Sequence, residues 1–571
     1  MTRAEANGSR PVAAGDERWR GTGRALGALI GVVAATAALG AGELVTGLFG
    51  PGPSLVTAIG GEFVDRFAAS LKDLAVAIFG TNDKTALIVG IVVIALVLGA
   101  VLGRLAGRRP ILAALGFGAF GAIGWWAYET DPQGQAGVGP VAAAASVAAG
   151  VGTLLGLHYL ARRPRRADVG AAVSDRRATV ATSRRTVLLG AGSVAAASAA
   201  AAFVGRRLGS SDVVDAAREA TRLPTPATTA SSAPPASSAA TGSTAATAST
   251  AATASTAETA GTAAATTTTT APPSFLVPGL SPYVTPNADF YRIDTALRTP
   301  QVDVDDWTLS ITGMVDRPYE LTFDELVAMS TTEETVTLSC VSNEVGGNLV
   351  GNAVWQGVPL ATLLERAGVQ EGATQIVGRS VDDFTAGFPT DVGLDGRVAL
   401  VAVAMNGEPL PTAHGFPARL VVAGLYGYVS ATKWLREIEL TTWEDFDGYW
   451  VPRGWSKEGP IKTQSRIDVP RGGTQLTAGT QAVAGVAWSP PAGISAVEVR
   501  VDEGEWMAAT LGESDSANTW VQWVLEWEAE PGEHVLTVRA TDGDGTVQTE
   551  EPARPAPDGA SGWHRRRVQV R

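Results

Sequence analysis

Cysteine and histidine are scarce in this sequence. Its 571 residues include one cysteine, Cys340, and four histidines. A single thiol excludes an intrachain disulfide, and it also excludes a structural zinc site built from four cysteines or from paired cysteines and histidines. Acidic residues outnumber basic ones, which gives a formal net charge of −13. The chain therefore lacks the cationic balance typical of proteins that bind nucleic acid, and we expect no such partner.

Long apolar stretches, by contrast, are abundant in the first part of the chain. Five of them are long enough, or nearly so, to cross a bilayer as helices. They lie near Leu26–Leu48, Ala86–Leu105, Ile111–Tyr128, Val138–Leu160 and Val187–Val204. Buried helices of a soluble protein are the alternative, which the combined length and flanking charge disfavour. We therefore expect a cytoplasmic N-terminus over 1–24 and a membrane region over 25–206.

Arginines flank these stretches on one side. They precede the first stretch and fill the connections after the second and the fourth. Residues 129–137 contain no base, and residues 51–84 contain Glu62, Asp65, Asp73 and Asp83 against few bases. By the positive-inside rule, the N-terminus is cytoplasmic and the chain after the fifth stretch lies outside. We expect a multi-pass protein of the cell membrane with an extracytoplasmic C-terminal half.

Two shorter patterns accompany this region. Ser183, Arg184, Arg185 and Leu188 open the fifth stretch and resemble the twin-arginine signal, which directs the export of already folded proteins. Additional positive charge on the cytoplasmic side is the alternative, but a weakly hydrophobic last span before an exported domain favours the signal. Residues 62–80, in the first external connection, have the spacing of an amphipathic helix on the membrane surface.

A compositional break separates the two halves of the chain. Residues 211–273 are almost all Ala, Thr, Ser and Pro. Such a segment has too few large apolar side chains to offset the entropy of ordering, so we expect a disordered linker over 207–274. The sequence leaves open whether this linker is O-glycosylated.

The remainder has the patterns of two globular domains. Over 275–464, helical periodicity at 321–329 and 359–369 alternates with strand-like runs at 334–340 and 374–380, which predicts an α+β domain. Over 465–571, short apolar runs alternate with Gly, Pro and Asp turns, which predicts a β-sandwich of immunoglobulin-like size.

Cys340 stands where a predicted strand enters a polar turn, "SNEVGGN". A thiolate there could reach a bound metal or substrate beside backbone N–H groups. A buried cysteine that serves as a small hydrophobic residue is the alternative.

Three segments together resemble the molybdopterin-binding domain of the sulfite oxidase family. They are "FYRIDTAL", "TLSCVSNEVGGNLVGNAVWQGVPLATLLERAGV" and "MNGEPLPTAHGFPARLVVAGLYGYVSATKWLREIEL". The C-terminal β region resembles the dimerisation domain of the same family, so the resemblance covers roughly residues 280–571 in the expected order. It implies a molybdenum–molybdopterin cofactor, oxo-transfer chemistry and a homodimer.

The resemblance also implies roles for individual residues. Cys340 matches the thiolate ligand of the molybdenum, which suits a soft ligand and a thiophilic metal. His414, Arg419 and Lys433 match positions that contact the pterin and its phosphate, and Arg and Lys are the usual partners of phosphate. Arg292 matches an arginine beside the metal that lines the substrate pocket, with a plain surface arginine as the alternative. Asn287, Ser342 and Asn343 are weaker candidates for hydrogen bonds to the cofactor.

This chain also departs from the family pattern. Ile293 and Asp294 follow Arg292 where animal and plant sulfite oxidases have Asn and His, and Trp455 stands where they have an active-site tyrosine. Arg453 beside it supplies positive charge, so we include Arg453 and Trp455 among the candidate catalytic residues. The reaction class is expected to be kept, but the loss of the phenolic O–H puts sulfite specificity in doubt.

Electrons from such a reaction need a partner. The sequence contains no b-type haem domain, and His158 is the one histidine in the five apolar stretches, whereas a bis-histidine haem needs paired ligands. We expect no haem, and an unidentified electron donor or acceptor that is external or membrane-bound. We expect a small oxyanion or oxide as substrate: oxidation of sulfite or a related anion, with reduction of an S- or N-oxide as the alternative. The alternative to an enzyme is a surface-displayed binding module that catalyses no reaction.

Overall fold

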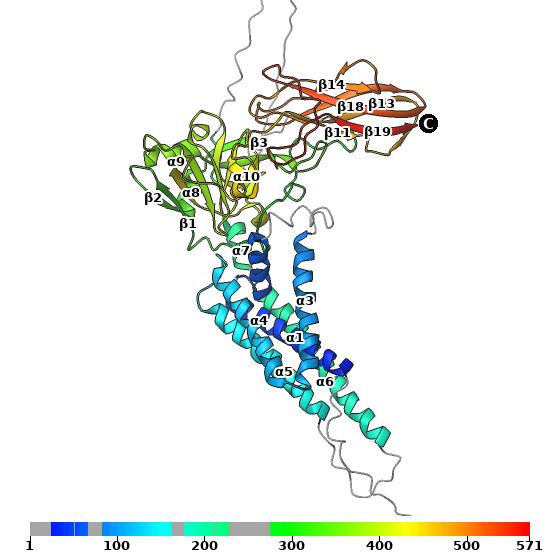
Figure 1. Cartoon of the computed structure of the whole chain (residues 1–571). Coiled ribbons are helices and arrows are strands. Elements are labelled where there is room, and N and C mark those ends of the chain that lie inside the picture. Colours follow the sequence, from blue (N-terminus) through cyan, green and yellow to red (C-terminus); the bar gives the residue numbers. More distant parts are fainter. Residues whose placement is uncertain (1–23, 51, 67–82, 163–175, 210–211, 228–274) are drawn as a thin grey trace, which may run out of the picture. The chain divides into compact units, whose positions relative to one another are not determined.

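The computed structural model describes residues 24–50, 52–66, 83–162, 176–209, 212–227 and 275–571 (Figure 1). These residues form two compact units. Unit 1 contains the N-terminal helices as far as Ala220, together with two short segments from later in the chain, 294–306 and 381–384. Unit 2 contains Thr221–Ile293, Trp307–Ser380 and Thr385–Arg571.

Five helices of unit 1 are long and apolar enough to cross a membrane. They are α1 (Arg24–Leu48), α3 (Asp83–Ala106), α4 (Pro110–Thr130), α5 (Val138–Arg162) and α6 (Arg176–Leu208). The apolar part of the last helix, Thr186–Leu208, begins where the sequence predicts, and α6 continues before it to Arg176, so that the helix includes Arg184 and Arg185. Of the amphipathic helix expected over 62–80, the structure describes only the first part, within a helical stretch over 55–66, and residues 67–80 lie outside the described residues.

Glycines allow the helices of unit 1 to approach one another closely. α1 contacts α3, α5 and α6. A Cβ on Gly31 would lie 1.9 Å from the carbonyl oxygen of Gly99, and a Cβ on Gly47 would lie 2.0 Å from that of Gly205. Small residues at such crossings let helix backbones pack directly, which is the usual packing mode of helices in a bilayer.

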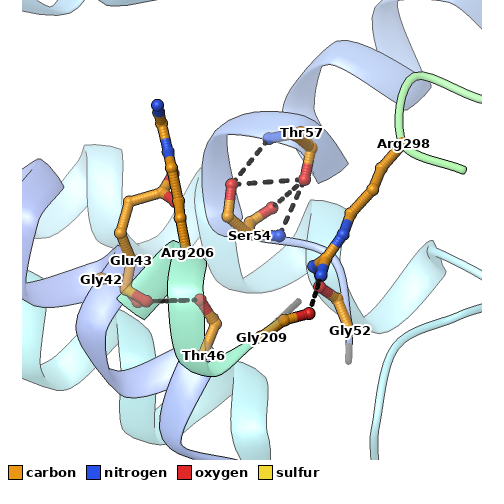
Figure 2. A network of polar contacts seen from close by, with 9 residues as sticks. All are labelled: Gly42, Glu43, Thr46, Gly52, Ser54, Thr57, Arg206, Gly209 and Arg298. Carbon is orange, nitrogen blue, oxygen red and sulfur yellow. Dashed lines mark hydrogen bonds and ion pairs between the residues drawn. The ribbon is translucent and has the colours of Figure 1, made fainter. Parts of the chain in front are cut away.

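The segment 294–306 is held by polar contacts within unit 1. Arg298 donates to the carbonyl oxygens of Gly52 and Gly209, which follow α1 and α6 (Figure 2). The Lys84 ammonium, at the start of α3, lies 2.5 Å from Oδ1 of Asp294 and 2.7 Å from the carbonyl oxygen of Ala296. This segment therefore belongs with the apolar helices, although it lies within the expected α+β domain.

The expectation of a structureless linker was wrong for its first part. Residues 212–220 form helix α7 (Asp212–Ala220). Residues 221–227 belong to unit 2, where the Pro224 carbonyl accepts from Gln356 Nε2 at 2.7 Å and the Ala227 N–H donates to the Thr331 carbonyl at 2.7 Å. Residues 228–274 lie outside the described residues.

Unit 2 begins with an α+β fold, as expected. One sheet has the order β2-β1-β10-β5-β6, and a second has the order β3-β4-β7-β8 with β9 beside β7. The strands of the first are β1 (Thr308–Gly313), β2 (Tyr319–Thr322), β5 (Gln375–Ser380), β6 (Thr385–Pro389) and β10 (Leu435–Thr441). Those of the second are β3 (Thr332–Ser339), β4 (Val350–Pro359), β7 (Ala399–Met405), β8 (Glu408–Pro409) and β9 (Arg419–Val422).

Short helices join these strands. α8 (Phe323–Met329) begins with a capping box in which Thr322 and Glu325 bond each other's backbone N–H, and α9 (Leu360–Ala367) ends at Gly368 with φ of +70°. α10 (Gly427–Ser430) follows β9. The elements expected at 321–329, 334–340, 359–369 and 374–380 are confirmed as α8, β3, α9 and β5.

The C-terminal part of unit 2 consists of two further sheets. Their orders are β11-β13-β17-β16 and β12-β19-β18-β14-β15. The strands of the first are β11 (Gln464–Val469), β13 (Gly479–Trp488), β16 (Thr510–Leu511) and β17 (Val521–Ala529). Those of the second are β12 (Gln475–Leu476), β14 (Ile494–Val501), β15 (Met507–Ala508), β18 (Gly532–Asp542) and β19 (His564–Val570). Buried side chains from both sheets share one core, including Ile467, Trp523, Val499 and Leu536. The region is therefore β-rich, while its immunoglobulin-like character stays a prediction.

Candidate active site

Cys340 directly follows β3 and begins a closed loop over 340–349. Its N–H donates to the Leu349 carbonyl at 2.9 Å, and the Asn343 N–H donates to the Cys340 carbonyl at 3.0 Å. Asn343 Oδ1 accepts from the Leu349 N–H at 2.8 Å, and the Ser342 N–H is directed at Cys340 Sγ at 3.4 Å. Cys340 is 7% exposed. The loop thus holds one thiol in a defined position, with the Ser342 N–H directed at its sulfur.

Two tyrosines lie near this thiol. Burial, followed by the proximity of Cys340, raises the pKa of Tyr291 far above its usual range. Burial raises the pKa of Tyr426 to about 12, and Asp558 and Cys340 act in the same direction. A Cβ on Gly427 would lie 3.9 Å from the Tyr291 hydroxyl, so the start of α10 also lies beside this ring. Both phenols stay protonated at neutral pH and can donate hydrogen bonds.

His414 lies at the end of a short 3₁₀ turn before β9, and it is 6% exposed. Its Nε2 lies 3.0 Å from the carbonyl oxygen of Asn287, and its ring makes an edge contact with Phe290 at 5.7 Å. Burial and, after it, the nearby cations lower the pKa of His414 to about 4. Those cations are Arg419, Lys433 and Arg292. The imidazole is therefore neutral at pH 7, with its proton on Nε2 and an acceptor lone pair on Nδ1.

Arg419 is a buried cation without a carboxylate partner among the described residues. It is 5% exposed, donates from Nη1 to the His414 carbonyl at 3.1 Å, and stacks at 4.9 Å over the ring of Trp355. Burial lowers its pKa to about 10. Lys433 lies nearby, with Nζ 3.4 Å from the Ala413 carbonyl. A buried charge of this kind is costly unless an anion compensates it, so the site has the charge expected for an anionic ligand.

The side chain of Asn287 is engaged within the protein. Its Nδ2 donates to Glu408 Oε1 at 2.6 Å and to the Met405 carbonyl at 3.3 Å, and its Oδ1 accepts from Asn406 Nδ2 at 2.7 Å. Asn406 adopts a left-handed φ of +53° in the turn between β7 and β8. Asn287 contributes to the site through its carbonyl, which holds His414.

Arg453 and Trp455 lie on a separate segment near α10. The Arg453 guanidinium stacks 3.6 Å from the centre of the Tyr449 ring, and its Nη1 donates to the Tyr449 carbonyl at 2.6 Å. Trp455 contacts the ring of Tyr428 at 5.9 Å. Tyr428 donates to the carbonyl of Ser456 at 2.6 Å, which fixes this segment beside the helix that follows Tyr426.

The structure thus gathers one group of the expected site residues and shows others that the sequence analysis missed. Around the thiol and the buried histidine lie Cys340, Ser342, Asn343, Arg292, His414, Arg419 and Lys433. The missed residues are Tyr291, Tyr426 and Asn406. Tyr291 adjoins Arg292 in the segment already singled out, whereas nothing local marks Tyr426 or Asn406 as close to the site.

The side chains at this site agree with the cofactor that the sequence implies. Among the described residues there is no group of three or more His, Cys, Asp or Glu side chains placed to hold a metal ion. The residues present are instead one buried thiol, a buried arginine without a carboxylate partner and a neutral histidine. This set fits a metal that arrives with most of its own ligands on an anionic organic group.

Comparison with known proteins agrees with this chemistry. The family model "Oxidoreductase molybdopterin binding domain" matches residues 296–450. The chain is 36% identical over 180 residues to an uncharacterized oxidoreductase of Bacillus subtilis, covering 31% of this chain and 87% of that protein. It is 29% identical over 343 residues to rat mitochondrial sulfite oxidase, covering 50% of this chain and 62% of that protein. It is 34% identical over 177 residues to a tomato nitrate reductase, covering 26% of this chain and 19% of that protein.

Proposed function

Because this chain belongs to the sulfite oxidase family of molybdopterin-dependent oxidoreductases, we propose that it is a membrane-anchored enzyme that performs oxo transfer outside the cytoplasm. The observation that supports this most is the joint presence of the buried Cys340 thiol and the buried, carboxylate-free Arg419. A binding module without cofactor would have no reason to retain both. The five apolar helices support the anchoring, and the arginine distribution supports the orientation.

We assign roles to the site residues on this basis. Cys340 holds the molybdenum, and Arg419 and Lys433 hold the anionic end of the pterin cofactor. His414 accepts a hydrogen bond at Nδ1, because its Nε2 proton is engaged by Asn287. Ser342 and Asn343 keep the thiol in place. When bound, the cofactor supplies the oxo group and takes up the electron pair.

Arg292 is proposed to hold the substrate. It is exposed, yet close enough to His414 to lower the pKa of that histidine, so it places positive charge at the open side of the site. Arg453 and Trp455 are proposed to lie on the same side of the site, because Trp455 contacts Tyr428 of α10 and Gly427 of α10 lies beside Tyr291. This charge suits a small oxyanion, and sulfite is the first candidate. The match to a nitrate reductase and the tryptophan at 455 keep reduction of an N- or S-oxide as the second candidate.

Further parts of the proposal concern the partners. Oxidation of sulfite to sulfate releases two electrons, so an electron acceptor is required, and we expect it outside this chain. Homodimerisation through residues 465–571 and export of the folded, cofactor-loaded domain by the twin-arginine route complete the proposal. Size measurement in detergent and replacement of Arg184 and Arg185 by Lys test these two points.

The central test uses the full chain purified in detergent from a host that makes molybdopterin. We expect near-stoichiometric molybdenum and pterin, and oxidation of sulfite with ferricyanide as artificial acceptor. Cys340→Ser should lose the metal and the activity but keep the fold. A folded wild-type protein without molybdenum would refute the proposal, and a molybdenum-loaded protein that reduces nitrate but ignores sulfite would select the second candidate.

A further inference from the structure

The loop that carries Cys340 is contacted by the C-terminal β-rich region. Arg466, on β11, donates from Nη1 to the carbonyl oxygen of Gly347 at 2.8 Å. Both partners lie in unit 2. A single backbone carbonyl in the middle of the loop is thereby tied to a side chain from a strand more than a hundred residues later.

Arg466 is itself fixed on two further sides. Its Nε donates to Asp468 Oδ1 at 2.6 Å, and its Nη2 donates to Ser281 Oγ at 2.9 Å. Asp468 in turn accepts from the Ser281 N–H at 3.1 Å. The side chains of Arg466 and Asp468 are 9% and 10% exposed. The buried guanidinium donates to three different partners, and these hydrogen bonds restrict it to a single orientation. It can therefore fix the position of the Gly347 carbonyl oxygen.

His564, on β19, makes a second contact with the same loop. A Cβ on Gly346 would lie 2.2 Å from the His564 ring, so the loop backbone passes directly against the imidazole. Gly346 also has φ of +74°, which disfavours any other residue there. The ring is fixed because its Nδ1 accepts the N–H of Ile467 at 2.9 Å. Burial lowers the pKa of His564 to about 4, so the ring is neutral at pH 7 and Nδ1 is free of a proton.

Contacts within the loop connect Gly346 and Gly347 to Cys340. The Gly347 N–H donates to the Glu344 carbonyl at 2.8 Å. A Cβ on Gly347 would lie 2.5 Å from Asn343 Oδ1, and that oxygen accepts from Leu349. Leu349 accepts the N–H of Cys340. Displacement of Gly346 or Gly347 would therefore move the residues that close the loop around Cys340.

We propose that Arg466 and His564 are positioning residues for the Cys340 thiol, so that the C-terminal β-rich region fixes the geometry of the metal ligand. This role is additional to any part of that region in dimerisation, and it rests on the proposed function of Cys340. The alternative is a purely structural role, in which Arg466 and His564 stabilise the packing of the β-rich region against the α+β region of unit 2 without affecting the position of the Cys340 thiol.

The test uses the thiol itself, because Cys340 is the only cysteine in the chain. We would prepare the full chain in detergent from a host that cannot make molybdopterin, and measure the rate at which Ellman's reagent labels the thiol. The variants are His564→Gln and Arg466→Lys. The lysine keeps the positive charge beside Asp468 but lacks the planar guanidinium that donates to three partners. Arg567→Met is the control, because it breaks an exposed ion pair with Glu533 at 3.1 Å on the same strand as His564.

We expect both variants to label about tenfold faster than wild type at a temperature where all proteins are folded, and the control to label at the wild-type rate. In the loaded enzyme, the charge-transfer absorption from sulfur to metal should shift in the same two variants. Labelling rates equal to wild type in the folded variants would overturn the proposal, as would equal acceleration in Arg567→Met. If one of the two variants does not fold, the labelling rate of the other variant tests the proposal. Because labelling needs no cofactor, a failure of the proposed function would show separately, as an absence of molybdenum in the wild type.

Discussion

Replacement of Arg419 by Met should stabilise the cofactor-free protein while abolishing cofactor binding. The burial of Arg419 lowers its pKa from 12.5 to about 10. At about 1.4 kcal/mol per unit, the charged form costs the folded state roughly 3 kcal/mol at pH 7. The cost applies in full there, because a base with a lowered pKa loses this penalty only when the pH rises past that pKa.

Part of this cost is offset within the chain. The stacking of Arg419 on Trp355 at 4.9 Å contributes about 1 kcal/mol. Its hydrogen bond to the His414 carbonyl contributes about 1 kcal/mol more. Methionine fills a similar volume without a charge, so we expect a net gain in stability of about 1 kcal/mol, or about 2–4 °C in the midpoint of thermal unfolding.

The assay compares thermal unfolding of the full chain with and without cofactor, together with the pterin content. Loaded wild-type protein should unfold at a higher temperature than its cofactor-free form, whereas Arg419→Met should show no such difference. Arg379→Met is the control, because Arg379 already pairs with Glu439 and should not affect pterin content. If cofactor-free Arg419→Met is clearly less stable than wild type, the charge is already compensated within the chain and the reasoning fails.

Two other perturbations test the electrostatics. Stability should fall as the pH drops from about 6.5 to about 4, because His414 and His564 have pKa values lowered to about 4 while the unfolded chain takes up protons near 6.5. The double variant His414→Gln/His564→Gln should show a smaller loss of stability over this pH range, measured by unfolding at each pH. His534→Gln is the control and should show the same loss as wild type, because Asp502 raises the pKa of His534. The same loss of stability in the double variant and wild type would contradict the assignment to His414 and His564. Lys84→Met should accelerate hydrogen exchange over 294–300, because it leaves the buried Asp294 carboxylate without this partner. Arg206→Met is the control for Lys84→Met, because it breaks the ion pair with Glu43 shown in Figure 2. Equal hydrogen exchange in Lys84→Met and wild type would mean that the contact between Lys84 and Asp294 does not hold residues 294–300 in place.

Much of the fold followed from local patterns, and the exceptions have physical causes. Apolar length located the five long helices, but it could not show that α6 extends back to Arg176, because arginine is a good helix former. Composition suggested disorder from residue 207, yet residues 221–227 are ordered by bonds to Gln356 and Thr331, which are distant in sequence. The parallel pairing of β1 with β10 is likewise a long-range feature that no local pattern encodes.

The site shows the same division. The residues around Cys340 and His414 could be found because they lie in short segments with recognisable order. Tyr426, Asn406, Arg466 and His564 could not, because each reaches the site or its loop through tertiary contacts. A supporting contact made by an ordinary strand residue leaves no signature in a single sequence.

The attachment of residues 221–227 changes what proteolysis would do to this protein. The Ala/Thr-rich segment leaves unit 2 at Ala227 and returns to it at Phe275, whose N–H donates to Gln522. A cut between 228 and 274 would therefore break the backbone without separating the two products at once, because residues 221–227 would remain hydrogen-bonded to Gln356 and Thr331 while still joined to α7. Release of the C-terminal product would need two further events: the dissociation of residues 221–227 from Gln356 and Thr331, and the dissociation of residues 294–306 from the helices of unit 1.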